Sequence, residues 1–207
     1  MKESAQRPLF RRKAAFRSKN VLKAFLGLVP VKFQAIILPM KKFNELLTVH
    51  QIALASLIAA LYAGFSIMLA PISFGPVQFR IAEALTLLPW AIPASVPGLF
   101  VGCLLANIIG GYGIIDIALG SAATLLAAWL TSRAPNLWLA ALPPVVINAL
   151  VVGSYIGILS HTPVLWSVLY IGLSQAVICF GTGIPMMHYL KRSAALGKYF
   201  TREEKSK

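Results

Sequence analysis

The sequence predicts an all-α integral membrane protein built from six transmembrane helices, and two observations support this. Hydrophobic residues make up 58% of the 207-residue chain and charged residues only 12%, whereas about a quarter of a soluble domain is charged. Between Leu46 and Leu190 only four side chains are charged, namely Arg80, Glu83, Asp116 and Arg133. Long apolar stretches of about twenty residues favour helices over barrel strands, which would alternate polar and apolar residues.

Proline and glycine residues divide the apolar region into six predicted helices. The first three cover about residues 50–70, 80–92 and 94–109, and the last three about 114–132, 137–159 and 163–190. Pro89, Pro93 and Pro97 crowd the junction between the second and third helices. Each proline removes a backbone donor, so we expect a bent connection that other helices shield from lipid.

Basic residues flank the apolar region and predict its orientation. Eleven of the nineteen Lys and Arg residues precede residue 43, and six follow residue 190. Six spans place both termini on one side, and a cytoplasmic N-terminus leaves only Arg80 on the outer side. This agrees with the positive-inside rule, so we expect cytoplasmic termini. The net charge of +13 is therefore a membrane-topology signal and does not indicate nucleic-acid binding.

The chain divides into three parts by composition. Residues 1–39 form a basic extension, residues 40–192 the six-helix membrane domain, and residues 193–207 a charged cytoplasmic tail. Met40 is followed by two lysines and then by the first apolar helix, which is how a bacterial membrane protein often begins. We therefore expect the mature chain to start at Met40.

Polar side chains in the helices gather at similar depths and suggest a binding pocket. Three of the charged residues and one amide fall near the outer ends of separate helices, and two further amides fall near mid-depth. A few directed polar groups in an apolar wall are typical of a solute pocket, here open to the outside. The candidate substrate-binding residues are Arg80, Glu83, Asn107, Asp116, Asn148 and Gln175.

Each candidate also has a purely structural interpretation. Arg80 and Glu83 are three residues apart, so they share a helix face and could pair with each other. Asp116 opens a helix and could cap it or meet its positive end. Asn148 and Gln175 could form hydrogen bonds between helices. The residues alone leave both sets of roles open.

Small residues recur along the first helix. Ala55, Ala59 and Ala63 share one face and would let another helix approach closely, either inside this chain or from a partner. Cys103 and Cys179 lie in apolar segments and are expected to be buried, unreactive thiols. No Cys or His cluster has the spacing of a metal site, so we expect no metal.

Four segments resemble the QueT transporter family. They are LAPISFGPVQFRIAEALTLLP, PGLFVGCLLANIIGGYGIIDIALGSAATLLAAWLT, LPPVVINALVVG and LYIGLSQAVICFGTGIP, and the similarity extends over about residues 53–190. The resemblance implies a substrate-binding S component of an energy-coupling factor (ECF) transporter, a multi-pass protein of the bacterial cell membrane. Such a component binds a micronutrient outside and joins a transmembrane coupling (T) subunit and two ATPase subunits. It needs no cofactor itself, because the ATPase subunits use the ATP.

The resemblance also implies a substrate and a docking face. The family is thought to take up queuosine precursors, chiefly 7-aminomethyl-7-deazaguanine (preQ1), and S components dock through small residues such as those of the alanine face. A carboxylate, from Glu83 or Asp116, could accept both donors on the edge of a deazaguanine. The family pattern leads us to expect glutamate where Gln175 stands, which leaves open a related deazapurine as the substrate.

Three alternatives belong to other classes of protein, namely an enzyme, a pump that acts alone and a stand-alone secondary carrier. An enzyme is not expected, because Asp116 has no second aspartate and no histidine at its depth. A pump acting alone is excluded by the lack of a phosphate-binding loop of the form G-x-x-x-x-G-K-[ST]. A stand-alone secondary carrier for a small nucleobase-like or vitamin solute remains the alternative, although the sequence shows no internal repeat typical of such carriers.

Overall fold

The computed structural model describes residues 49–73, 79–111 and 113–193. Within these ranges 86% of the residues are helical and none lies in a strand. The chain divides into two compact units, residues 1–54 and 55–207. Only Val49–Leu54 of the first unit are described. The basic extension, Met40 and all but the first residue of the tail lie outside the described residues.

The first three predicted helical segments are present, with boundaries within a few residues of those expected. They contain α3 (Val49–Met68) with the short α4 (Ala70–Ser73), then η1 (Ile81–Leu87) with α5 (Leu88–Ala91), then α6 (Ser95–Gly110). Gly111 ends α6 in the left-handed conformation at a φ of 71°, which glycine adopts without steric cost.

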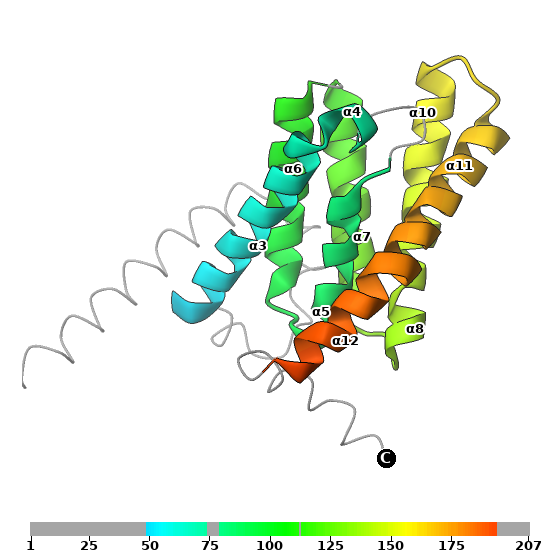
Figure 1. Ribbon diagram of the computed structural model, residues 1–207. Helices are drawn as coiled ribbons and strands as arrows, with labels where there is room; N and C mark the ends of the chain where they lie inside the picture. Colours follow the sequence, from blue (N-terminus) through cyan, green and yellow to red (C-terminus); the bar gives the residue numbers. More distant parts are fainter. Residues whose placement is uncertain (1–48, 74–78, 112, 194–207) are drawn as a thin grey trace, which may run out of the picture. The chain divides into compact units, whose positions relative to one another are not determined.

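The last three segments also match the predicted ranges. They contain η2 (Asp116–Gly120) with α7 (Ser121–Thr131), then α8 (Leu137–Ala140), α9 (Leu142–Ile147), η3 (Asn148–Val152) and α10 (Gly153–Leu159), and finally α11 (Val164–Ala176), η4 (Val177–Gly183) and α12 (Ile184–Arg192). Figure 1 shows α10 and α11 packed side by side, and α6 beside α7.

Three of the described helices are long and apolar enough to cross a membrane. They are Val49–Met68, Leu137–Leu159 and Val164–Arg192. The other three apolar segments, Ile81–Ala91, Ser95–Gly110 and Asp116–Thr131, have between 10 and 17 residues. A spanning helix usually needs about twenty. Length and composition therefore identify a membrane protein with three clear spans.

The helices are irregular at defined places. Residues Ile81–Leu87 form a 3₁₀ helix directly before Pro89, where the Leu88 N–H bonds to the Leu85 carbonyl in the shorter 3₁₀ pattern. The segments η2, η3 and η4 are π-helical. Such turns are rare and often lie at functional sites. Here η2 begins at Asp116, η3 begins at Asn148, and η4 begins two residues after Gln175.

Glycine pairs bring neighbouring helices into close contact. A Cβ on Gly98 would lie 2.5 Å from the Ala55 carbonyl oxygen, and one on Gly102 would lie 2.8 Å from that of Ala59. Between α10 and α11, a Cβ on Gly153 would lie 2.7 Å from the Val168 Cα. Any side chain at these glycines would force the helices apart.

The alanine face of the first helix is thus used inside the chain. Ala59 and Ala63 are buried, and Ala55 and Ala59 lie directly against α6. A partner subunit could reach this face only if α3 separated from α6. Of the two roles that the sequence allowed for Ala55, Ala59 and Ala63, the structure shows internal packing for Ala55 and Ala59, and docking by this face stays a prediction.

Candidate functional site

All six predicted binding residues are buried, and the structure brings them together. None is more than 3% exposed. Four of them line one pocket, which is bordered by Arg80, Glu83, Gly120, Thr124, Asn148, Val152, Ile171 and Gln175. The other two, Asn107 and Asp116, lie beside it in the same hydrogen-bond network. Five separate stretches of the chain therefore contribute to one polar site.

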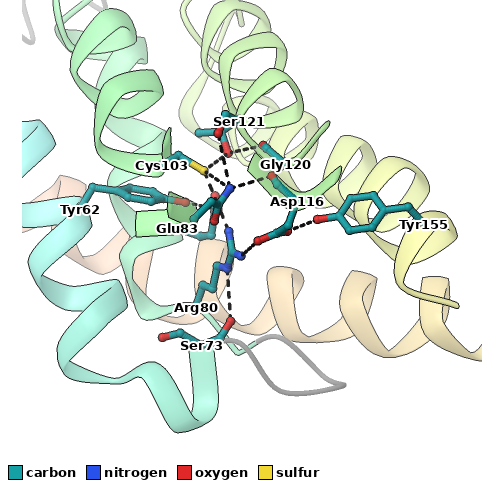
Figure 2. A network of polar contacts seen from close by, with 11 residues as sticks. Tyr62, Ser73, Arg80, Glu83, Cys103, Asp116, Gly120, Ser121 and Tyr155 are labelled. Atoms are coloured by element: carbon teal, nitrogen blue, oxygen red, sulfur yellow. Dashed lines mark hydrogen bonds and ion pairs between the residues drawn. The ribbon is translucent and has the colours of Figure 1, made fainter. Parts of the chain in front are cut away.

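Arg80 and Asp116 form a buried ion pair across two helices. Arg80 Nη2 lies 3.3 Å from Asp116 Oδ2, and Arg80 Nε donates to the Ser73 carbonyl at 3.2 Å. The Tyr155 hydroxyl donates to the other carboxylate oxygen of Asp116 (Figure 2). Both Asp116 oxygens are thus engaged, and the side chain makes no cap to its own helix. The ion pair is a role for Asp116 beyond the helix cap and the ligand contact that the sequence suggested.

Glu83 is held differently from Asp116. Its carboxylate is 1% exposed, and Oε1 accepts a 2.5 Å hydrogen bond from the Tyr62 hydroxyl of α3. The Asn148 amide also interacts with this carboxylate. Oε2 has no hydrogen-bond partner among the described residues. A buried carboxylate oxygen without a partner is energetically costly, so this atom is poised to accept a donor from a ligand.

Asn107 ties the centre of the cluster together. Its Nδ2 donates to the Asp116 carbonyl at 3.0 Å and lies 3.4 Å from Ser121 Oγ. It also lies 3.5 Å from Cys103 Sγ, which accepts a 3.2 Å bond from Thr124 Oγ1. Cys103 is buried as expected, yet it lies inside a polar network and not in an apolar one.

Gly120 leaves the space in which these groups meet. A Cβ there would lie 3.0 Å from Asn107 Nδ2, 3.2 Å from Asp116 Oδ1 and 3.3 Å from the Tyr155 hydroxyl. These distances are shorter than ordinary contacts to a methyl group. A methyl group at this position would require the polar groups to move by a few tenths of an ångström, so glycine permits their present close approach.

Gln175 of α11 supplies a second hydrogen-bond acceptor to the pocket that Glu83 of η1 also lines. It is 2% exposed, and its Oε1 has no hydrogen-bond partner among the described residues. The cavity between these side chains measures about 10 Å³, which is room for about one water molecule, so a larger solute enters only if the surrounding side chains move.

Sequence reasoning missed several members of the network. Tyr62, Thr124 and Gly120 were not singled out, although Tyr62 follows Ala59 by three residues and so lies near the inward face of its helix. Thr124 is four residues after Gly120 and donates to its carbonyl at 3.1 Å. Hydroxyl groups in apolar helices often bond to their own backbone in this way, so their spacing alone gave no signal.

The site has no residue group arranged to hold a metal in the part of the chain that is described. No set of three His, Cys, Asp or Glu side chains there is close enough to bind an ion. The polar atoms instead form directed hydrogen bonds around a small pocket, which is the chemistry of recognising an organic solute.

An all-helical chain with apolar spanning helices and a buried polar pocket is an integral membrane protein. The QueT transporter family matches residues 52–192, which is more than half of the chain, so this chain belongs to that family. Membership makes it a transport protein and argues against an enzyme. No curated protein and no solved structure matches the chain.

Proposed function

We propose that this chain is the substrate-binding S component of an ECF importer in a bacterial cell membrane. It has six spans and cytoplasmic termini, and it captures a queuosine precursor, 7-aminomethyl-7-deazaguanine or a related deazapurine, from outside. Membership of the QueT transporter family supports this assignment. The six apolar segments of the structure are consistent with the proposed topology.

The unpartnered Glu83 Oε2 is the observation that carries the proposal. The edge of a deazaguanine presents a ring N–H beside an exocyclic amino group, and one carboxylate can accept both in parallel. Tyr62 holds Oε1 in place but leaves it further lone-pair capacity, because an ionised carboxylate has about four acceptor positions. Glu83 is therefore pre-positioned for a ligand with two adjacent donors.

A buried ion pair borders Glu83 in the same site. Asp116 neutralises Arg80 at 3.3 Å and is itself held by Tyr155. Arg80 and Asp116 thus form a preorganised wall of the site. In this proposal Glu83, Asn148 and Gln175 contact the ligand, while Arg80, Asn107 and Asp116 shape the pocket.

The proposed partners are a coupling subunit and two ATPase subunits, and docking uses the exposed face of α3. The small residues on that face are Ser56, Ala60 and Gly64, and all three are exposed. Apart from its own helix backbone and chain neighbours, no atom of the described residues lies within 4 Å of the place where a Cβ on Gly64 would lie. Close helix approach in a membrane favours such small residues.

Titration of the purified chain with a panel of deazaguanines tests substrate capture. Wild-type protein should bind, and Glu83→Gln should weaken binding by about 100-fold or more, because two charge-assisted hydrogen bonds are affected. Normal binding by Glu83→Gln would remove the proposed role of this residue. Thr182→Val is a suitable control, since the Thr182 hydroxyl bonds to the Ile178 carbonyl and does not line the pocket.

Reconstitution tests the coupling. The chain should co-purify with a coupling subunit and two ATPases, and uptake into liposomes should require them and ATP. Uptake by this chain alone, without ATP, would indicate the stand-alone carrier instead.

A further inference from the structure

The cavity at the centre of the site is closed to an organic solute. It measures about 10 Å³, which is room for about one water molecule, and its lining includes Glu83, Asn148 and Gln175. A solute larger than water therefore enters only when part of the wall moves away. Segments that open locally have few contacts with the rest of the fold, so the wall that opens should be the one held most weakly.

The helices α10 and α11 form a hairpin, residues 153–176, whose two arms are closely joined. A Cβ on Gly153 would lie 2.7 Å from the Val168 Cα, and one on Gly157 would lie 2.9 Å from the Val164 Cα. The two helices are thus in direct contact at two successive turns of α10 (Figure 1). Because packing this close leaves no slack between the two arms, the hairpin should move as a single body.

Turns of π-helix bound this hairpin at both ends. The segment η3 (Asn148–Val152) directly precedes α10, and η4 (Val177–Gly183) directly follows α11. Such turns interrupt the regular hydrogen-bond ladder and are places where helices bend. The hairpin can therefore tilt about these two turns while its own helices stay intact.

One side chain of α10 reaches the opposite wall of the cavity. The helix packs mainly against α11 and against η3, the preceding turns of its own helix. Only Ser154 and Tyr155 of α10 have polar side chains. The Ser154 hydroxyl donates to the Leu150 carbonyl in the same helix, whereas the Tyr155 hydroxyl donates to Asp116 of η2 (Figure 2). The bond from Tyr155 to Asp116 therefore holds the hairpin against η2.

This bond lies at the outer side of the cavity in the proposed topology. Asp116 precedes the lining residue Thr124 in a segment that runs inward, and Tyr155 follows the lining residue Asn148 in a segment that runs outward. Both ends of the bond are thus closer to the outside than the lining residues of the same segments. Breaking it would open the cavity toward the side from which a solute is captured.

From these observations we propose that the α10–α11 hairpin is the entry gate of the cavity and that the bond from Tyr155 to Asp116 is its latch. When the Tyr155 hydroxyl leaves Asp116, the outer half of the hairpin tilts away from η2. Asp116 keeps its ion pair with Arg80 at 3.3 Å, so the opposite wall stays in place. The direction of entry rests on the proposed function, because that function supplies the topology and the solute.

The two native cysteines measure opening without any ligand. Cys103 Sγ lies 3.2 Å from Thr124 Oγ1 and 4.0 Å from Arg80 Nη1, and both of these residues line the cavity. Cys179 belongs to η4 and is also buried. The purified full chain is treated with methyl methanethiosulfonate, a small uncharged thiol reagent, and mass spectrometry gives the labelling rate of each cysteine. Opening of the gate exposes Cys103, whereas general unfolding exposes both.

Tyr155→Phe removes the latch and keeps the ring, which packs in an apolar cluster with Ala123 and Ile171. Loss of a hydrogen bond to a carboxylate should accelerate labelling of Cys103 by about tenfold or more and leave the rate of Cys179 within about twofold. Ser154→Ala is the matched control in the same turn of α10. It should leave both rates unchanged, because the Ser154 hydroxyl bonds only within its own helix.

Two results would overturn the gate. One is an unchanged Cys103 rate in Tyr155→Phe, and the other is an equal acceleration of both cysteines, which would indicate general loosening of the fold. Neither result depends on a ligand. If deazaguanines bind and the Cys103 rate is unchanged, the gate fails and the proposed function stands. If no deazaguanine binds but Tyr155→Phe exposes Cys103 selectively, the proposed function fails and the gate stands.

Discussion

Replacing Asp116 by leucine tests whether the Arg80–Asp116 pair is structural. Both side chains are at most 4% exposed, and their charged atoms lie 3.3 Å apart. The leucine leaves the Arg80 cation buried without its partner and also removes the acceptor of the Tyr155 hydroxyl. Removing one partner of a buried pair costs about 3–5 kcal/mol. For a chain of this size that corresponds to a fall in Tm of roughly 6–20 °C.

The two buried cysteines provide the assay. Cys103 and Cys179 are each 0% exposed, so a thiol-reactive fluorescent dye reports their exposure as the protein unfolds in detergent. The double variant Arg80→Met with Asp116→Leu should recover part of the lost stability, since no unpaired charge then remains buried. If Asp116→Leu alone unfolds within about 2 °C of wild type, the pair contributes little to stability and Asp116 becomes a candidate ligand contact again.

Three further predictions concern small residues. Gly102→Ala should lower stability by about 1–3 kcal/mol, because its Cβ would lie 2.8 Å from the Ala59 carbonyl oxygen, whereas Gly64→Ala should be neutral or stabilising in the same dye assay. Ala60→Trp should leave ligand binding intact and abolish ATP-driven uptake, whereas Ala59→Trp should impair folding; normal uptake by Ala60→Trp would remove the proposed docking face. Gly120→Ala should weaken deazaguanine binding at least about tenfold by separating the polar groups around it, and unchanged binding would show that the network tolerates the methyl group.

The helical segments could be predicted from sequence because hydrophobicity and helix-breaking residues act locally. The expected range 137–159 agrees with the observed Leu137–Leu159, and 94–109 lies one residue from Ser95–Gly110 at each end. The burial of six polar residues together was also foreseeable, since each would be costly in lipid alone. The depth of a residue in the membrane follows from its position along a helix, because a helix rises by a fixed distance per residue. Counting residues was therefore sufficient to place these six side chains at similar depths.

The partners of each charge could not be predicted, because they depend on the rotation of the helices about their axes. A π-helical turn inserts a residue and turns everything after it by about 100° relative to a regular helix. Such turns begin at Asp116 and at Asn148, so the facing expected from a regular period fails at the site itself. The sequence allowed Arg80 to pair with Glu83 along its own helix, and the structure shows an ion pair between Arg80 and Asp116 on another helix.

The different roles proposed for Glu83 and Asp116 follow from the number of hydrogen-bond partners that each carboxylate has. Asp116 accepts from Arg80 on one oxygen and from Tyr155 on the other, so each of its oxygens already has a partner. Glu83 has one oxygen bonded to Tyr62 and one without a partner in the part of the chain that the structure describes, so a ligand donor there would replace an unfavourable buried acceptor with a hydrogen bond. A ligand gains binding energy where the empty site leaves buried polar atoms without hydrogen bonds. Glu83 Oε2 and Gln175 Oε1 are such atoms among the described residues, so this protein should select its ligand through them.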